Sequence, residues 1–234
     1  MPETIAIFFC ATLLRAIFGF GDALIAMPLL TLTLGLGTAT PLFALIATSS
    51  SLTIFISTFR QIDFKISRQL VFASILGIPF GLILIKLVPE AIVMRVLGVF
   101  LIVFAFNRLI RKQAPRIKNR WWGYGFGFVA GVLGSAFNTN GPPIVTYAAL
   151  RQWPPDSFRS NLQGYFFPIG LMIVASHGIS GLWTVRVGQL YLACLPAALA
   201  VIAIGSKVHQ TLSPKKFETL LSLLLVILGV VLMI

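Results

Sequence analysis

The chain has 234 residues, of which 58% are hydrophobic and only 10% are charged. A soluble domain carries about a quarter charged residues and less than half apolar ones, so this composition excludes a soluble enzyme, a disordered protein and a disulfide-rich secreted module. The net charge is +12, but no nucleic-acid-binding motif accompanies it, and we expect no nucleic-acid partner. Basic residues in short loops between apolar segments instead indicate the orientation of a membrane protein.

Long stretches without charged residues predict the membrane elements. A helix needs about 20 mostly apolar residues to cross a hydrocarbon core about 30 Å thick. Four stretches of the chain contain no Asp, Glu, Lys or Arg: 23–59, 121–150, 161–185 and 187–206. Shorter candidates are 69–85, 91–110 and 219–234. These patterns predict an all-α polytopic membrane protein with roughly seven or eight membrane elements and no soluble domain.

The chain resembles two related halves. When Gly19 is aligned with Gly134, Pro28 aligns with Pro143 and Thr31 aligns with Thr146. We therefore expect one transmembrane transporter domain over 1–234, built from these segments: a first repeat at about 4–110, a basic loop at 111–120, and a second repeat at about 121–234. Each repeat has an opening element and three transmembrane helices.

Both opening elements are interrupted in the middle by residues that break helices. The first carries Gly19, Phe20 and Gly21, and the second carries the run 134–143, rich in Gly, Asn and Pro. Each element is either one interrupted span or a re-entrant hairpin that enters and leaves on one side. The hairpin alternative places most basic loop residues on one side of the membrane, as the positive-inside rule requires. It also makes the halves inverted repeats, which is a common transporter plan.

The breaks are the candidate binding site. Backbone N–H and C=O groups cannot stay unpaired in hydrocarbon, so a broken helix must face protein or a polar cavity. Asn138 and Asn140 supply polar groups at the second break, and Gly141 and Pro142 suit the first turn of a new helix. The free N–H groups at such a helix start attract anions.

These motifs resemble those of the TauE/SafE sulfite exporter family. The first-half motif is Gly19-Phe20-Gly21 followed by an apolar helix with Pro28, and the second-half motif is 138–143 followed by Tyr147. Further similarities are Ala47-Thr48-Ser49 and Arg159-Ser160-Asn161, and the resemblance covers nearly the whole chain. It implies a multi-pass protein of the cell inner membrane that exports sulfite or a small organosulfonate.

One departure from the family concerns Asp22, which stands where the family often has a third glycine. We expect Asp22 to cap the helix 23–34; the alternative is a protonatable site that couples transport to proton flow. We expect Arg15 to be an unpaired interfacial residue, the alternatives being a place in the cavity or a pair with Asp22. Arg159 is the candidate for oxyanion recognition, against a snorkelling role.

The expected substrate-binding residues are therefore Gly19, Gly21, Asp22, Thr48, Ser49, Asn138, Asn140, Gly141, Pro142 and Arg159. Thr48 and Ser49 belong to a hydroxyl run inside an apolar span, where bonds to the preceding turn are the alternative to ligand contact. The expected partners are a small anion and membrane lipid. Proton coupling is a further possibility, and the sequence does not indicate an oligomeric state.

No residue pattern predicts catalysis, a cofactor or a metal site. His177 and His209 stand alone, and no His/Cys/Asp cluster has metal-ligand spacing. The expected function is a secondary transporter working by alternating access. The alternatives are a permease of the same plan for a carboxylate or another small solute, and an anion channel.

Overall fold

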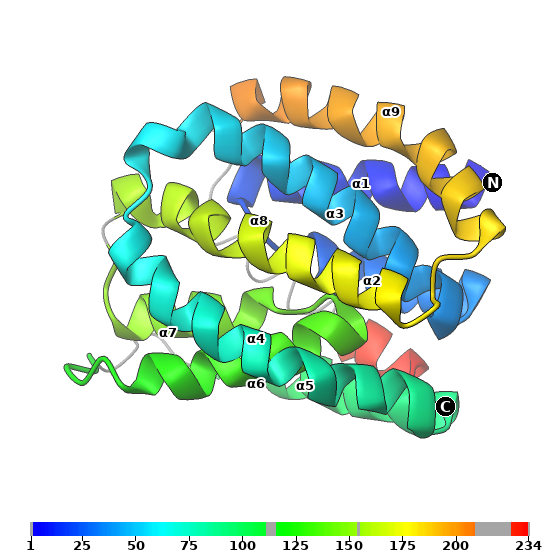
Figure 1. Cartoon of the computed structure of the whole chain (residues 1–234), viewed down its shortest axis with the longest axis horizontal. Coiled ribbons are helices and arrows are strands. Elements are labelled where there is room, and N and C mark those ends of the chain that lie inside the picture. Colours follow the sequence, from blue (N-terminus) through cyan, green and yellow to red (C-terminus); the bar gives the residue numbers. More distant parts are fainter. Residues whose placement is uncertain (1, 111–115, 154, 209–225, 234) are drawn as a thin grey trace.

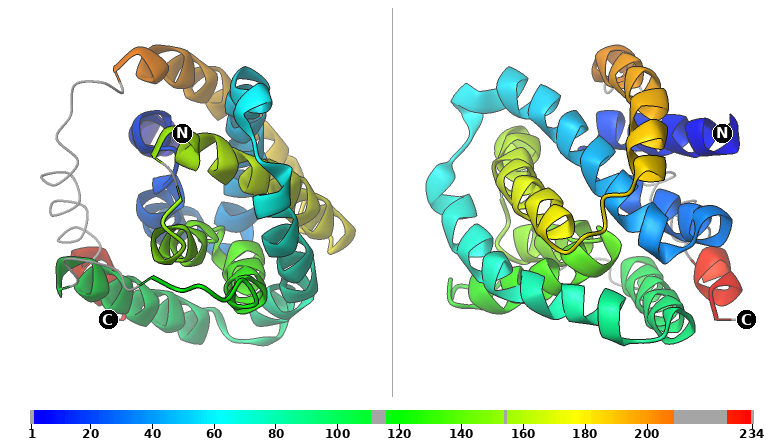
Figure 2. Two further views of the ribbon diagram at one scale, coloured as in Figure 1. Left: turned by 90° about the vertical axis from the view of Figure 1, so that its left-hand side faces the viewer. Right: turned by 45° about the vertical axis from the view of Figure 1, so that its right-hand side comes forward.

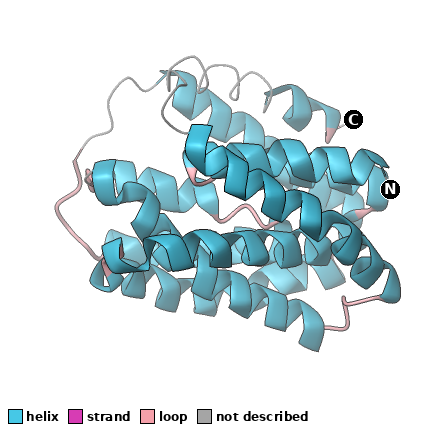
Figure 3. Ribbon diagram, turned by 90° about the horizontal axis from the view of Figure 1, so that it is seen from above, coloured by secondary structure: helices cyan, strands magenta, loops and turns pink. Residues whose placement is uncertain are grey.

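The fold was analysed in a computed structural model that describes residues 2–110, 116–153, 155–208 and 226–233. Within these residues every regular element is a helix, as Figure 3 shows, which confirms the all-α prediction. The helices of the first half are α1 Pro2–Phe18, α2 Asp22–Leu34, α3 Leu36–Thr58, the short η1 Phe59–Gln61, α4 Phe64–Leu87 and α5 Glu90–Ile110. Those of the second half are α6 Trp122–Phe137, α7 Gly141–Leu150, α8 Pro155–Ile179 and α9 Val185–Val208, with a further helical segment at 226–231.

Several of these helices are long and apolar enough to cross a membrane. In the described part of the chain there are four: Leu36–Gln61, Ser67–Leu87, Ser160–Ile179 and Val185–Ala203. Shorter apolar helices are Asp22–Leu34, Ala91–Phe106 and Trp122–Phe137. The expected last span, 219–234, lies largely outside the described residues. The chain is thus a polytopic membrane protein.

Both opening elements are broken at the predicted positions, and both fold back. Leu150, at the end of α7, accepts a backbone hydrogen bond from Ile117, just before α6 (2.9 Å between N and O). The α6–α7 pair is therefore a hairpin, and α1 and α2 likewise run in opposite directions (Figure 1). At about 1.5 Å per residue, α2 with 13 residues and α7 with 10 are too short for a core of about 30 Å.

Equivalent helices of the two halves make equivalent contacts with the opposite half. Helix α1 packs against α9 and α6 packs against α4, while α3 and α8 pack against each other. Each hairpin therefore contacts the fourth α-helix of the opposite half, α9 or α4 (Figure 2). Two apolar cores follow this division: one contains Phe8, Met27 and Ala198, and the other contains Leu70, Ile144 and Tyr165.

The interface between α4 and α6 depends on glycine. A Cβ atom on Gly131 would lie 2.1 Å from the Ser74 carbonyl oxygen, which no real side chain tolerates. Small residues let helix backbones approach closely where apolar burial alone gives little drive, as in a membrane. Glycine at this position therefore allows the close approach of α4 and α6.

More basic residues lie at one end of the helix bundle than at the other. The start of α4, the start of α6 and the ends of α3 and α7 lie at one end of the bundle, at the left of Figure 1. We call this the basic end, because it carries Arg60, Lys65, Arg68, Arg120 and Arg151. The end of α4 and the start of α9 lie at the opposite end, which carries Lys86 and Arg186.

Cysteine labelling in intact cells tests this arrangement in the membrane. In a Cys10→Ser, Cys194→Ala background, Asn119→Cys and Gln152→Cys should react with an impermeant maleimide from the same side, since both flank the α6–α7 hairpin at the basic end. Thr184→Cys, just before α9, should react from the other side. Labelling of positions 119 and 152 from opposite sides would contradict the hairpin.

Candidate functional site: a cavity between the two breaks

The two breaks meet at a small internal cavity. The first break, Gly19 to Gly21, has two glycines with positive φ (81° and 97°), a conformation that L side chains rarely adopt. The second break begins at Asn138, also with positive φ (54°), whose N–H group donates to the Gly134 carbonyl and so ends α6. Helices α2 and α7 then start at Asp22 and Gly141, each within one residue of the predicted start.

The cavity has a volume of about 40 Å³, which is room for a few waters or one small ion. It is lined from α1, from both breaks, from the first turns of α2 and α7, and from α3 and α8. Seven of the predicted site residues line it: Gly21, Asp22, Thr48, Asn138, Asn140, Gly141 and Pro142. Residues that lie far apart in the sequence therefore meet at one place.

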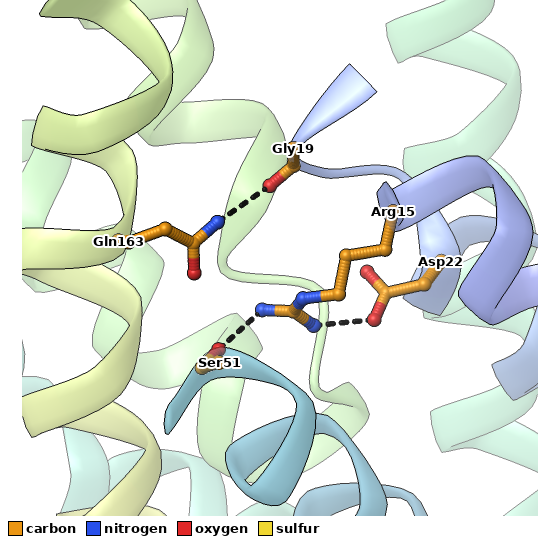
Figure 4. A network of polar contacts seen from close by, with 5 residues as sticks. All are labelled: Arg15, Gly19, Asp22, Ser51 and Gln163. Atoms are coloured by element: carbon orange, nitrogen blue, oxygen red, sulfur yellow. Dashed lines mark hydrogen bonds and ion pairs between the residues drawn. The ribbon is translucent and has the colours of Figure 1, made fainter. Parts of the chain in front are cut away.

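Arg15 is the cation of this cavity. Its side chain is buried, with 5% exposed for the whole residue. One terminal nitrogen forms an ion pair with the Asp22 carboxylate, and the other donates to the Ser51 hydroxyl (2.6 Å between Nη2 and Oγ). The guanidinium also lies over the Phe166 ring, 5.6 Å from its centre. The Nε atom is buried without a hydrogen-bond partner among the described residues (Figure 4).

These contacts correct two expectations. The expectation of an unpaired, interfacial Arg15 is wrong, because the side chain is buried and paired. The expectation that Asp22 caps α2 is also wrong: Gly21 holds the cap position, no side chain caps the helix, and the Asp22 carboxylate turns to Arg15. A buried guanidinium without a partner would be far more costly than a helix start without a cap.

Two of the predicted site residues that the structure describes, Gly19 and Ser49, are not in the cavity wall. The Gly19 carbonyl accepts a hydrogen bond from Gln163 on α8 (3.1 Å), which holds the first break against that helix. Ser49 donates to the Leu45 carbonyl and contacts the Tyr191 hydroxyl (2.9 Å) on α9. Arg159 belongs to α8, but its side chain lies outside the described part of the chain.

The second break is anchored as firmly as the first. The Asn138 side chain donates to the Thr40 carbonyl on α3 (2.8 Å between Nδ2 and O). Its amide is therefore engaged in holding the break, although the residue also lines the cavity. Asn140 lines the cavity without a side-chain hydrogen bond to a described residue, so its amide is available there.

The charge balance of the cavity favours one anion. The charges of Arg15 and Asp22 cancel, and no other charged side chain of the described residues lines the wall. The starts of α2 and α7 each add a partial positive charge, equivalent to roughly half an elementary charge per helix. Two converging helix starts and a buried guanidinium provide N–H donors for an anion, while the one carboxylate of the described wall, Asp22, is already paired with Arg15.

The comparison with known families identifies the chain. A family described as "Sulfite exporter TauE/SafE" matches residues 4–232. The chain belongs to the TauE/SafE family. This membership makes it a membrane transporter of the sulfite-anion type, and it confirms the resemblance seen in the sequence. No curated protein and no solved structure gives a significant match. The cavity at the two motifs is therefore the candidate anion site of this TauE/SafE protein.

The ion pair can be tested through stability. Arg15→Gln should lower the free energy of unfolding by about 3–5 kcal/mol, because it leaves the Asp22 carboxylate buried without its partner. The double variant Arg15→Gln, Asp22→Asn removes both charges and should recover most of that loss. Thermal unfolding in detergent micelles measures both. Equal losses for the single and the double variant would contradict this explanation, because removing the Asp22 charge would then bring no recovery.

Proposed function

We propose that this protein is a secondary transporter that exports sulfite or a small organosulfonate across the cell inner membrane, and that the cavity between the two breaks binds the anion. The observation that carries the proposal is the buried guanidinium of Arg15 at the point where the starts of α2 and α7 converge. Family membership supports the class of substrate, and the geometry supports the place.

The chemistry of the wall suits a small oxyanion. A guanidinium presents several N–H donors in a plane and binds oxyanions through two of them at once. Asn140 and the backbone N–H groups of the first turns of α2 and α7 supply further donors. A sulfite ion or a sulfonate group has three oxygens on one sulfur and can accept from all these directions. The small volume suits a small anion.

The arrangement of the halves supports alternating access. One unit consists of α1, α2, α3 and α9, and the other of α6, α7, α8 and α4, with α3 and α8 in contact between them. The cavity has walls from both units. Rocking of one unit against the other would open the cavity first to one side and then to the other, as in transporters with inverted repeats. We propose that each unit corresponds to one repeat, 4–110 or 121–234, with one exchange. Helix α9 belongs to the unit of the first repeat, and α4 belongs to the unit of the second.

The Asp22 carboxylate is the counter-ion of Arg15 in this structure. It holds the Arg15 group that the anion needs, so substrate and Asp22 compete for one guanidinium. Protonation of Asp22 would release Arg15 and allow the anion to bind, which couples anion transport to a proton. Among the side chains that the structure describes, Arg15 is the only charged group besides Asp22 that lines this cavity. His177 on α8 donates to the Ser135 carbonyl instead and is not part of the wall.

A transport assay tests the site. Proteoliposomes with the double variant Arg15→Gln, Asp22→Asn should show at least about tenfold slower flux of labelled sulfite than the wild type, because a lost charge-assisted hydrogen bond costs about 1.5–3 kcal/mol. Ser49→Ala, whose hydroxyl points to α9 and not into the cavity, is the control and should keep wild-type flux. Sulfite flux at the wild-type rate in the double variant would disprove the site.

The coupling is tested separately by the pH dependence of Asp22→Asn. In the wild type, binding of methanesulfonate, which does not titrate in this range, should strengthen as the pH falls, because proton uptake by Asp22 frees Arg15. The variant has no carboxylate, so its affinity should already be high at neutral pH and should not change with pH. Isothermal titration in detergent measures both. An unchanged pH dependence in the variant would remove Asp22 from the coupling and leave the anion site standing.

A further inference from the structure

A second hollow, of about 680 Å³, lies at the basic end of the bundle, away from the substrate cavity. The start of α4, the start of α6 with the residue before it, and the end of α7 form its walls. Four basic side chains line it: Lys65, Arg68, Arg120 and Arg151. No acidic residue is among the lining residues, and none of the four forms an ion pair with an acidic residue in the described ranges.

The hollow is held in shape by hydrogen bonds between its walls. Gln69 of α4 donates to the Arg120 carbonyl (2.8 Å between Nε2 and O). Arg151, just after α7, donates through Nη1 to the carbonyls of Ile117 and Lys118 (3.1 and 2.6 Å). Three separate segments are thus tied together, although their like charges repel one another. A bound anion would remove this repulsion.

Aromatic residues place the hollow at the level of the lipid headgroups. Trp121 and Tyr124 lie against each other, with ring centres 5.4 Å apart, and both are exposed. Phe72 of α4 is exposed as well. In a membrane protein, exposed Trp and Tyr settle at the interface between hydrocarbon and water. The hollow therefore has cations at the depth of phosphate groups and apolar rings at the depth where acyl chains begin.

We propose that this hollow binds the phosphate group of an anionic membrane phospholipid. Basic hollows between helices on the positively charged side of a membrane protein suit anionic headgroups, and arginine forks suit phosphate oxygens. Free phosphate shares this chemistry, but the exposed aromatic rings favour a ligand that also carries acyl chains. The bound lipid joins α4 to the α6–α7 hairpin, so it stabilises the element that carries the second break.

The opposite end of the bundle provides the matched control. Arg186, in the first turn of α9, is exposed and has the exposed Trp183 close by in the sequence. Arg186 therefore matches the test residues in charge and in having an aromatic neighbour, but it lies at the opposite end of the bundle and outside the hollow. The test variant is Arg68→Gln with Arg120→Gln, since both side chains are exposed and the Arg120 hydrogen bond uses only its carbonyl.

The test measures lipid binding to the full-length purified protein in detergent. Native mass spectrometry and thermal unfolding are followed with phosphatidylglycerol, with phosphatidylcholine and with inorganic phosphate. We expect phosphatidylglycerol to bind and to raise the melting temperature, and phosphatidylcholine to do neither. The double variant should bind phosphatidylglycerol at least tenfold more weakly, and Arg186→Gln should bind like the wild type.

Three outcomes would overturn the proposal. Equal binding by the wild type and the double variant would show that the hollow is not the site. Equal loss in Arg186→Gln would show that overall charge, and not this hollow, attracts the lipid. Stabilisation by inorganic phosphate as large as that by phosphatidylglycerol would assign the hollow to free phosphate.

Discussion

An interrupted helix in apolar surroundings must find partners for its free backbone groups, and the rest of this structure depends on how that requirement is met. Each break is fastened to a helix outside its own hairpin: Gln163 of α8 donates to Gly19 in the first break, and Asn138 of the second break donates to Thr40 of α3. Because α3 and α8 also pack against each other, both breaks are anchored to the same pair of helices. The cavity between them follows from this arrangement.

The buried ion pair then gives the cavity its character. Burying an arginine is tolerated only when it is paired, and Asp22 supplies that pair at the start of α2. The same carboxylate is the one acidic group in the described wall, so the contact that stabilises the fold would compete with the anion in the proposed function. We propose that this pair links stability to function, because an anion would have to displace or neutralise the carboxylate to bind Arg15.

The breaks could be predicted from the sequence because their causes are local. Glycine at positions 19 and 21 allows positive φ, and Asn138 allows it better than most residues. The ion pair could not be predicted in the same way. Two residues seven positions apart on a continuous helix lie about 10 Å apart along its axis, so Arg15 and Asp22 can touch only because the chain reverses between them. Spacing alone therefore favoured an unpaired Arg15 and a capping Asp22, and gave their ion pair only as an alternative.

Contacts between distant segments were also beyond the reach of sequence patterns. The Ser49 hydroxyl contacts the Tyr191 hydroxyl, and nothing near Ser49 in the sequence indicates that α9 packs there.

The central claim is that the transported anion lies between the two breaks. An anomalous-scattering structure of the protein soaked with selenite, which matches sulfite in shape and charge, tests this most directly. The account predicts a selenium peak within hydrogen-bonding reach of Arg15, between the starts of α2 and α7, and a selenium peak elsewhere in transport-competent protein would contradict it.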